Sequence, residues 1–258
     1  VHLCVNLVPR VTRKRDILAY LWRGGDEIGA QGDCRKWAMS ESGDTLEMVE
    51  RPQGGFSFVL VDGQRSGKAA KAISNLVARK AISDLAEGVR DGAVARAAHD
   101  YLYTYKGGKV SATLNILSVD LVSSTVVLSR NNPCPIIIIT PDDGLQLLDE
   151  PSGPVGVRRG TKPQITELPT EVGTTVVVYT DGLETAGARS SRVFDVPAAV
   201  RELTAQGNFS AQELADRLLE RALVLDEGRP HDDISVLVLR VLDRTGDSVR
   251  RLTLTIPL

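Results

Sequence analysis

Apolar residues recur three or four positions apart in two consecutive stretches of the chain, a spacing that predicts helices. The first stretch starts at Ser66 and runs for about 20 residues, to a stop at Gly88. The second opens at Asp91 and is ended by the pair Gly107-Gly108. The apolar positions are Ala69, Ile73, Leu76, Val77 and Ala81 in the first stretch and Val94, Ala98 and Leu102 in the second. The pattern therefore predicts a pair of helices between residues 66 and 106.

Short β-rich apolar runs, separated by turn residues, predict a series of strands after this helix pair. These strands are placed at 111–119, 125–130, 135–140, 145–148 and 175–179, with two last strands at 234–241 and 252–256. A helical region is expected at 194–224, and its second part opens with a capping box formed by Ser210 and Glu213. Near the N-terminus, 16–22 is expected to be a short helix, and 36–41 and 56–61 are expected to be strands joined by a loop at 51–55.

A helix pair, then strands in sequence, then helices indicates an α+β architecture with antiparallel sheets. A doubly wound βαβ fold would alternate strands and helices more regularly. No stretch of the sequence looks like an interdomain linker, so one compact domain is expected, with residues 1–35 as an N-terminal extension of unassigned role and 36–258 as the functional domain.

Composition excludes several classes of protein. The 258 residues carry 33 acids and 31 bases, a net charge of −2, with 42% hydrophobic and 25% charged residues. This suits a globular protein rather than a disordered tail, a collagen-like chain or a disulfide scaffold. The small net charge gives no general support for nucleic-acid binding, although it allows a local basic patch. Cys4, Cys34 and Cys134 form no CxxC pair, and no apolar run is long enough for a membrane helix, so a cytoplasmic protein without a membrane partner is expected.

Aspartates stand at the ends of predicted strands in four places. Two of these places share one format, an apolar β run followed by Asp-Gly, at Asp62-Gly63 and Asp181-Gly182. The other two contain Asp44 and the pair Asp232-Asp233. A strand holds such an Asp rigidly, and a following Gly allows a backbone carbonyl to approach a ligand closely. Each place alone is typical of a turn, but the set indicates a site for hard cations such as Mg²⁺ or Mn²⁺, which prefer oxygen ligands.

The segment Gly63–Ala69 resembles a phosphate-binding P-loop, because it follows a strand and opens a helix. It has three residues between its glycines instead of four, and Ala69 instead of Ser or Thr after Lys68, which argues against a nucleotide site. Lys68 remains a candidate for binding an anion at the helix start. His231, beside the Asp pair, is either an exposed loop residue or a donor to a carboxylate, a bound phosphate or a leaving group.

Five segments, in this order, resemble the bacterial SpoIIE-like branch of the metal-dependent (type 2C) serine/threonine protein phosphatases. They are Ser-Gly-Asp at 42–44, Asp-Gly-Gln-Arg-Ser-Gly-Lys-Ala-Ala at 62–70, Ser-Gly-Pro-Val-Gly at 152–156, Tyr-Thr-Asp-Gly-Leu-Glu at 179–184 and Asp-Asp-Ile-Ser at 232–235. The resemblance covers residues 36–242 and implies two packed antiparallel sheets flanked by helices.

The resemblance also implies a centre of two Mn²⁺ or Mg²⁺ ions that activates water for in-line hydrolysis without a phosphoenzyme. In this family pattern Asp62 bridges both ions and the Gly63 carbonyl binds one of them. Asp44, Asp181 and Asp232 complete the ligands, with Asp233 as a second choice, and Asp62, Asp181 and Asp232 are the candidate catalytic residues. The helices at 66–106 would gate this centre.

The sequence departs from the family pattern at Arg65, where relatives usually carry Gly. Arg65 is either a bidentate clamp for the substrate phosphate or a surface residue. The expected substrate is a phosphoserine or phosphothreonine on a regulatory protein, an anti-sigma-factor antagonist, with no nucleic acid involved and a homodimer left open. Two alternatives remain: a non-catalytic, partner-binding regulator on the same fold, and, ranked last, a nucleotide-binding protein that uses the glycine-rich turn and Lys68.

Overall fold

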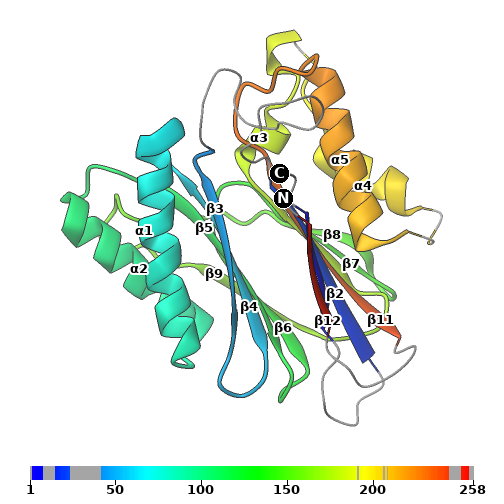
Figure 1. Cartoon of the computed structure of the whole chain (residues 1–258), viewed down its shortest axis with the longest axis horizontal. Helices are drawn as coiled ribbons and strands as arrows, with labels where there is room; N and C mark the ends of the chain where they lie inside the picture. Colours follow the sequence, from blue (N-terminus) through cyan, green and yellow to red (C-terminus); the bar gives the residue numbers. More distant parts are fainter. Residues whose placement is uncertain are drawn as a thin grey trace. The chain divides into compact units, whose positions relative to one another are not determined.

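The chain forms two antiparallel β-sheets, each with its own helices (Figure 1). The computed structural model describes residues 2–7, 15–23, 42–190, 192–205, 207, 209–243 and 251–255. Contacts divide the chain into two compact units. The five-stranded unit contains 41–135 and 149–170, and the seven-stranded unit contains 1–40, 136–148 and 171–258.

The five-stranded unit has the strand order β3-β4-β5-β6-β9, with every neighbouring pair antiparallel. The strands are β3 (Asp44–Glu50), β4 (Phe56–Gly63), β5 (Ala112–Asp120), β6 (Thr125–Asn131) and β9 (Gln164–Pro169). Two helices, α1 (Gly67–Ala86) and α2 (Asp91–Lys106), lie beside each other along this sheet (Figure 1). The predicted helix pair is therefore confirmed, to within a residue at most of its ends.

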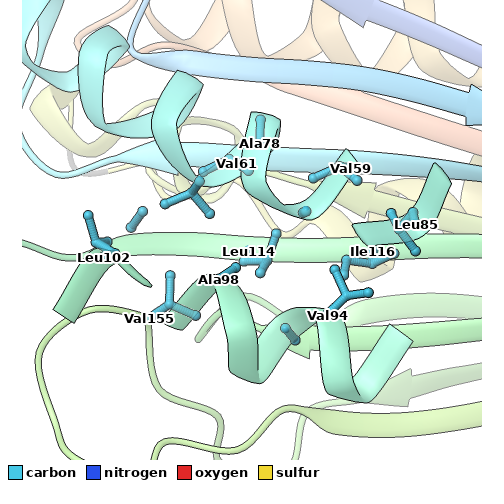
Figure 2. Close-up of a cluster of buried hydrophobic side chains, with 14 of the residues drawn as sticks. Val59, Val61, Ala78, Leu85, Val94, Ala98, Leu102, Leu114, Ile116 and Val155 are labelled. Atoms are coloured by element: carbon cyan, nitrogen blue, oxygen red, sulfur yellow. The ribbon is translucent and has the colours of Figure 1, made fainter. Parts of the chain in front are cut away.

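The core of the five-stranded unit lies between these helices and the sheet (Figure 2). Val59 and Val61 of β4 and Leu114 and Ile116 of β5 point toward α1 and α2 and are at most 1% exposed. The helices contribute Val77, Ala78, Ala81, Leu85, Val94, Ala98 and Leu102, all fully buried. Burial of each Val, Leu or Ile side chain contributes about 1.5–3 kcal/mol to the stability of the folded state. This cluster therefore fixes β4, which carries Asp62, and the neighbouring strand β5.

The seven-stranded unit has the strand order β12-β1-β2-β11-β10-β7-β8, again with antiparallel neighbours. The strands are β1 (His2–Leu7), β2 (Arg15–Arg23), β7 (Ile136–Thr140), β8 (Gly144–Leu148), β10 (Thr175–Tyr179), β11 (Ser235–Asp243) and β12 (Arg251–Thr255). The helical segments are α3 (Asp181–Glu184), the 3-10 turn Ala188–Ser190, α4 (Val196–Thr204) and α5 (Ala211–Leu225). Helix α5 packs on β11 and β2.

The α+β prediction of two antiparallel sheets flanked by helices is confirmed. The capping box at the start of α5 is also confirmed: the Glu213 amide donates to Ser210 Oγ at 3.0 Å, and the Ser210 amide donates to Glu213 Oε2 at 2.8 Å. None of the helices that the structure describes combines the length and apolar composition needed to cross a membrane. Cys134 is buried.

The short helix predicted at 16–22 is wrong, because these residues belong to strand β2, paired with β1 and β11. A short run that is apolar throughout has no period that separates a buried strand from a helix. Strands β1, β3 and β9 and the short helix α3 were not predicted. The strand expected at 36–41 lies outside the described residues, and the domain boundary at residue 36 stays a prediction, although β1 and β2 pair within the same sheet as β11.

Candidate active-site residues

Asp62 and Gly63 are the last two residues of β4, and the six residues of β4 before them are all buried. Asp62 lies directly opposite Asp44 of β3 and Thr113 of β5, so strands on both sides fix its backbone. Its amide N–H also donates to Thr113 Oγ1 at 3.3 Å. The structure thus confirms that the first Asp-Gly pair terminates a buried strand.

Gly63 has a packing reason to be glycine. A Cβ at this position would lie 2.1 Å from the backbone oxygen of Ala70, in the first turn of α1. Real Cβ atoms do not approach an oxygen this closely, so any side chain would push α1 away from the end of β4. The glycine therefore brings the start of α1 against the backbone that carries Asp62.

Asp44 is the first residue of β3 and is 1% exposed. Its amide N–H donates to Ser42 Oγ at 3.2 Å. Because Asp44 and Asp62 are directly opposed on neighbouring antiparallel strands, their side chains lie on the same face of the sheet. Like charges in this arrangement are destabilising, and a cation bound by both carboxylates would remove that cost.

Lys71 of α1 reaches the same place and was missed by the sequence analysis. Its Nζ donates to the backbone oxygen of Asp44 at 2.6 Å and to Thr45 Oγ1 at 3.2 Å. The available signal was its position one turn after Lys68 on the opening of a helix that follows Asp62. The ammonium group ties α1 to the strand that carries Asp44.

Arg65 and Lys68, the two predicted phosphate-binding residues of this unit, are both exposed. Arg65 has φ +82°, a left-handed conformation that favours glycine, so the residue is strained in the turn between β4 and α1. Lys68 is the second residue of α1, and Ser66 before the helix makes no side-chain cap. The turn therefore presents two cationic side chains beside the end of β4.

The second Asp-Gly pair stands at the end of β10, whose five residues are all buried. Asp181 is the first residue of the one-turn helix α3, and its backbone oxygen accepts a hydrogen bond from the Thr185 amide at 2.9 Å. A Cβ on Gly182 would lie 2.1 Å from the backbone oxygen of Asp233. This glycine thus holds the Asp232-Asp233 loop against the start of α3.

Further hydrogen bonds fix the same junction. The Thr180 amide donates to the Ser235 backbone oxygen at 3.1 Å, and the Ser235 amide donates to Thr180 Oγ1 at 2.9 Å. The structure therefore brings Asp181 and the 232–233 pair together within the seven-stranded unit, as the sequence analysis required of residues that share a site.

Negative charge dominates this junction. Burial raises the pKa of Asp181, and the carboxylates of Asp232 and Glu184 raise it further, against smaller opposing effects of the Gly182 amide and His231. Asp233 is 5% exposed, and Asp232 Oδ1 accepts a hydrogen bond from its amide at 3.1 Å. A raised carboxyl pKa means that the ionised form is disfavoured, and a bound cation would reverse that.

His231 lies near a carboxylate outside the predicted ligand set. Its Nδ1 is 3.6 Å from Asp226 Oδ2, while Asp226 Oδ1 accepts a hydrogen bond from the Gly187 amide at 2.9 Å. Of the predicted partners of His231, the structure therefore places a carboxylate beside it. Its role toward a phosphate or a leaving group stays a prediction.

The predicted ligands are distributed over both units. Asp44, Asp62 and Gly63 belong to the five-stranded unit, and Asp181, Asp232 and Asp233 belong to the seven-stranded unit. Within the described part of the chain, no group of three or more His, Cys, Asp or Glu side chains forms a metal-binding cluster. The donors are carboxylates and a carbonyl, which fit Mg²⁺ or Mn²⁺ in chemistry.

Comparison with known proteins links the chain to one family. The family described as Stage II sporulation protein E (SpoIIE) matches residues 52–242. No curated protein matches the chain. Among solved structures, the chain resembles the PP2C phosphatase domain with a regulatory-domain fragment of SpoIIE from Bacillus subtilis, at 18% identity and TM-score 0.70, over 95% of this chain and 66% of that chain.

Two other structures contain metal ions. One is RsbX in complex with magnesium, at 15% identity and TM-score 0.66, over 93% of this chain and 100% of that one. The other is the catalytic domain of the serine/threonine phosphatase PstP with two manganese ions, at 16% identity and TM-score 0.61, over 89% of this chain and 100% of that one. At these identities the likeness establishes a shared fold.

Proposed function

The chain belongs to the Stage II sporulation protein E (SpoIIE) family, and from this we propose that it is a metal-dependent protein serine/threonine phosphatase. The observation that carries the proposal is the matched pair of Asp-Gly junctions, each at the end of a buried strand and each next to a second Asp. Phosphatases of the same fold bind magnesium or two manganese ions.

In this proposal, Asp44, Asp62 and the Gly63 carbonyl bind the ions together with Asp181 and Asp232, and Asp233 is the reserve ligand. When bound, Mn²⁺ or Mg²⁺ activates the attacking water and neutralises charge on the phosphoryl oxygens. The chain's own contribution is rigidity: β4 and β10 hold Asp62 and Asp181, and the two glycines fix the neighbouring backbone. Preorganised ligands of this kind need little rearrangement during the reaction.

Three side chains are proposed to bind the substrate phosphate. Arg65 and Lys68 extend from the turn next to Asp62, and His231 adjoins Asp232. Arg65 presents a planar fork that matches two phosphate oxygens, while Lys68 acts as a point charge. We propose that the phosphate is carried by serine or threonine of a bacterial regulatory protein, an anti-sigma-factor antagonist, in keeping with the family.

The test is hydrolysis of p-nitrophenyl phosphate and of a phosphoserine peptide, with Mn²⁺ and with EDTA. We expect Mn²⁺-dependent release of phosphate from both, and loss of both activities in Asp62→Asn while circular dichroism shows a folded protein. If the folded wild type shows no metal-stimulated hydrolysis of any phosphopeptide tried, the proposed phosphatase activity is refuted.

The alternative is a non-catalytic regulator that binds partner proteins on the same fold. A complete set of oxygen ligands in the sequence disfavours it, since a pure binding module needs none. Calorimetry separates the two, because a regulator without a metal centre would take up no Mn²⁺.

A further inference from the structure

Basic and aromatic side chains gather on one part of the five-stranded unit, formed by the C-terminal half of α2, the residues after it and the 157–162 loop. We define this basic–aromatic surface by six exposed or half-buried residues: Tyr103, Lys106, Lys109, Arg158, Arg159 and Lys162. Asp100 is the only acidic residue in the segments 99–111 and 152–163. In a chain of net charge −2, this is a strong local excess of positive charge.

The aromatic part of the surface is the half-buried Tyr103. Its ring centroid lies 6.0 Å from that of the buried His99. Lys106 Nζ lies 4.7 Å from the centroid of the Tyr105 ring. Tyrosine and arginine are enriched at protein interfaces, where an aromatic ring buries a large area.

The 157–162 loop is joined to α2 by specific contacts. Arg159 Nε donates to the Tyr103 hydroxyl at 3.2 Å, and the Gly156 amide donates to Nδ1 of the buried His99 at 3.0 Å. Gly156 also approaches the Leu102 side chain so closely that it has no room for a Cβ. The two segments, about 50 residues apart in the chain, therefore form one continuous surface.

This surface adjoins the end of β4 that carries Asp62. Ala112, three residues after Lys109, pairs with Gly63 on one side and forms a bridge to Val155 on the other. The Gln64 amide also donates to the Ser111 backbone oxygen at 3.0 Å. The residues after α2 thus lead directly into backbone that is paired with Gly63 and Gln64, and the 157–162 loop is linked to it through the Ala112–Val155 bridge.

We propose that the basic–aromatic surface binds the acidic segment of a protein around its phosphorylated serine or threonine, and so selects the substrate of the phosphatase. The inference rests on the proposed function and names the chemistry of its substrate. The lysines and arginines complement acidic residues beside the phosphate, and Tyr103 packs against the apolar parts of the same segment. Exposed charges of this kind chiefly raise the association rate and are screened by salt.

The test compares two phosphoserine peptides, one with acidic flanking residues and one with neutral flanking residues, with p-nitrophenyl phosphate as a third substrate. The double variant Arg158→Glu/Lys162→Glu removes two positive charges from the surface and adds two negative ones. A matched control is Arg79→Glu/Arg201→Glu, which makes the same change of charge at two exposed helical positions outside the surface.

We expect the surface variant to lose about 10- to 100-fold in kcat/KM on the acidic peptide at low salt, with the p-nitrophenyl phosphate rate unchanged. The neutral peptide should change much less, and high salt should reduce the difference between wild type and variant. The control should behave as wild type on all three substrates. An equal loss on both peptides, or an equal loss in the control, would overturn the proposal.

Fluorescence anisotropy with the acidic phosphopeptide in EDTA tests the same surface without catalysis. We expect weaker binding by the surface variant than by the control, whether or not the chain hydrolyses phosphate. If the wild type hydrolyses nothing but binding still depends on Arg158 and Lys162, the proposed enzyme fails and the docking surface stands. If the surface variant binds the peptide as tightly as the control does, the docking surface is refuted.

Discussion

The two Asp-Gly junctions are alike in backbone and different in electrostatics. Asp62 is the last residue but one of β4, and Asp181 follows β10 by two positions; at both, a Cβ on the following glycine would lie 2.1 Å from a backbone oxygen. Asp62, however, adjoins a turn and helix that carry Arg65, Lys68 and Lys71. Asp181 is largely buried next to Asp232 and Glu184, and burial, followed by these carboxylates, raises the pKa of Asp181.

This difference indicates a division of work between the junctions. Both need a cation, because each places carboxylates near one another. The junction at Asp62 adds the exposed cationic side chains of Arg65 and Lys68, which suit an anionic substrate, and it leads into the basic–aromatic surface. We therefore expect substitutions at the two aspartates to have similar effects on metal-dependent activity, and substrate selection to depend on the five-stranded unit.

The largest effects are expected from removing the charge of the junction aspartates. Asp62→Asn and Asp181→Asn should each lower Mn²⁺-dependent kcat by about 100-fold or more, since the metal supplies several kcal/mol of transition-state stabilisation. Initial rates on p-nitrophenyl phosphate measure this. Glu184→Gln is the control, because Glu184 lies near Asp181 and its carboxylate accepts a hydrogen bond from the Tyr179 hydroxyl. Its kcat should fall by less than about 10-fold. Equal losses in all three variants would contradict a specific ligand role.

Next in size is the cost of a side chain at either glycine. Gly63→Ala and Gly182→Ala should each lower the free energy of unfolding by about 3 kcal/mol or more, because the new Cβ meets backbone that cannot turn away. Urea unfolding followed by circular dichroism measures the change. Gly153→Ala is the matched control, since a Cβ there meets nothing within 4 Å. If Gly63→Ala and Gly153→Ala are equally stable, α1 does not approach β4 as closely as described.

A smaller effect of opposite sign is expected without metal. In EDTA, Asp62→Asn should raise the free energy of unfolding by about 0.5–1 kcal/mol, because it removes the repulsion with Asp44 across the strands. Differential scanning calorimetry with and without Mn²⁺ should show the wild type gaining more from metal than the variant. Asp142→Asn, at an exposed turn, is the control and should leave both values unchanged. A less stable Asp62→Asn in EDTA would mean that the two carboxylates do not repel.

The smallest effect concerns pH and the loop of the five-stranded unit. Burial lowers the pKa of His99, so the unfolded chain binds a proton more readily than the folded one. The wild type should therefore keep full stability above the unfolded pKa of about 6.5 and lose stability as the pH falls below it. In His99→Gln the side-chain oxygen can still accept a hydrogen bond from the Gly156 amide. This variant should lose less stability than the wild type between about pH 7 and 5. Identical pH profiles by urea unfolding would show that His99 does not contribute.

The sequence was informative where long or repeated patterns exist. The helices α1 and α2, the capping box of α5 and strand β10 followed from apolar spacing and turn residues, because these segments pack one defined face or lie fully buried. Strand β9 was not predicted because it lies at the edge of its sheet and alternates only between half-buried and exposed positions. Strand β2 was taken for a helix because its apolar run has no decisive period.

For the candidate site, residue types and strand ends pointed to the aspartates. The structure places Asp44 and Asp62 at strand ends, Asp232 and Asp233 in the loop before β11, and Asp181 at the start of α3, just after β10. The contacts of Lys71 with Asp44 and Thr45, and the carbonyls that face Gly63 and Gly182, were beyond prediction. They depend on which turn of a helix or loop approaches a strand, and no local pattern in the sequence carries that information.

The most direct test of the central claim is the number of Mn²⁺ ions bound, measured by isothermal titration calorimetry of the wild type, Asp62→Asn, Asp181→Asn and the control Asp142→Asn. The account predicts that the wild type and Asp142→Asn each bind two ions. Each junction variant should bind fewer ions or bind them much more weakly. A wild type that binds no Mn²⁺, or junction variants that bind two ions as tightly as the wild type, would contradict it.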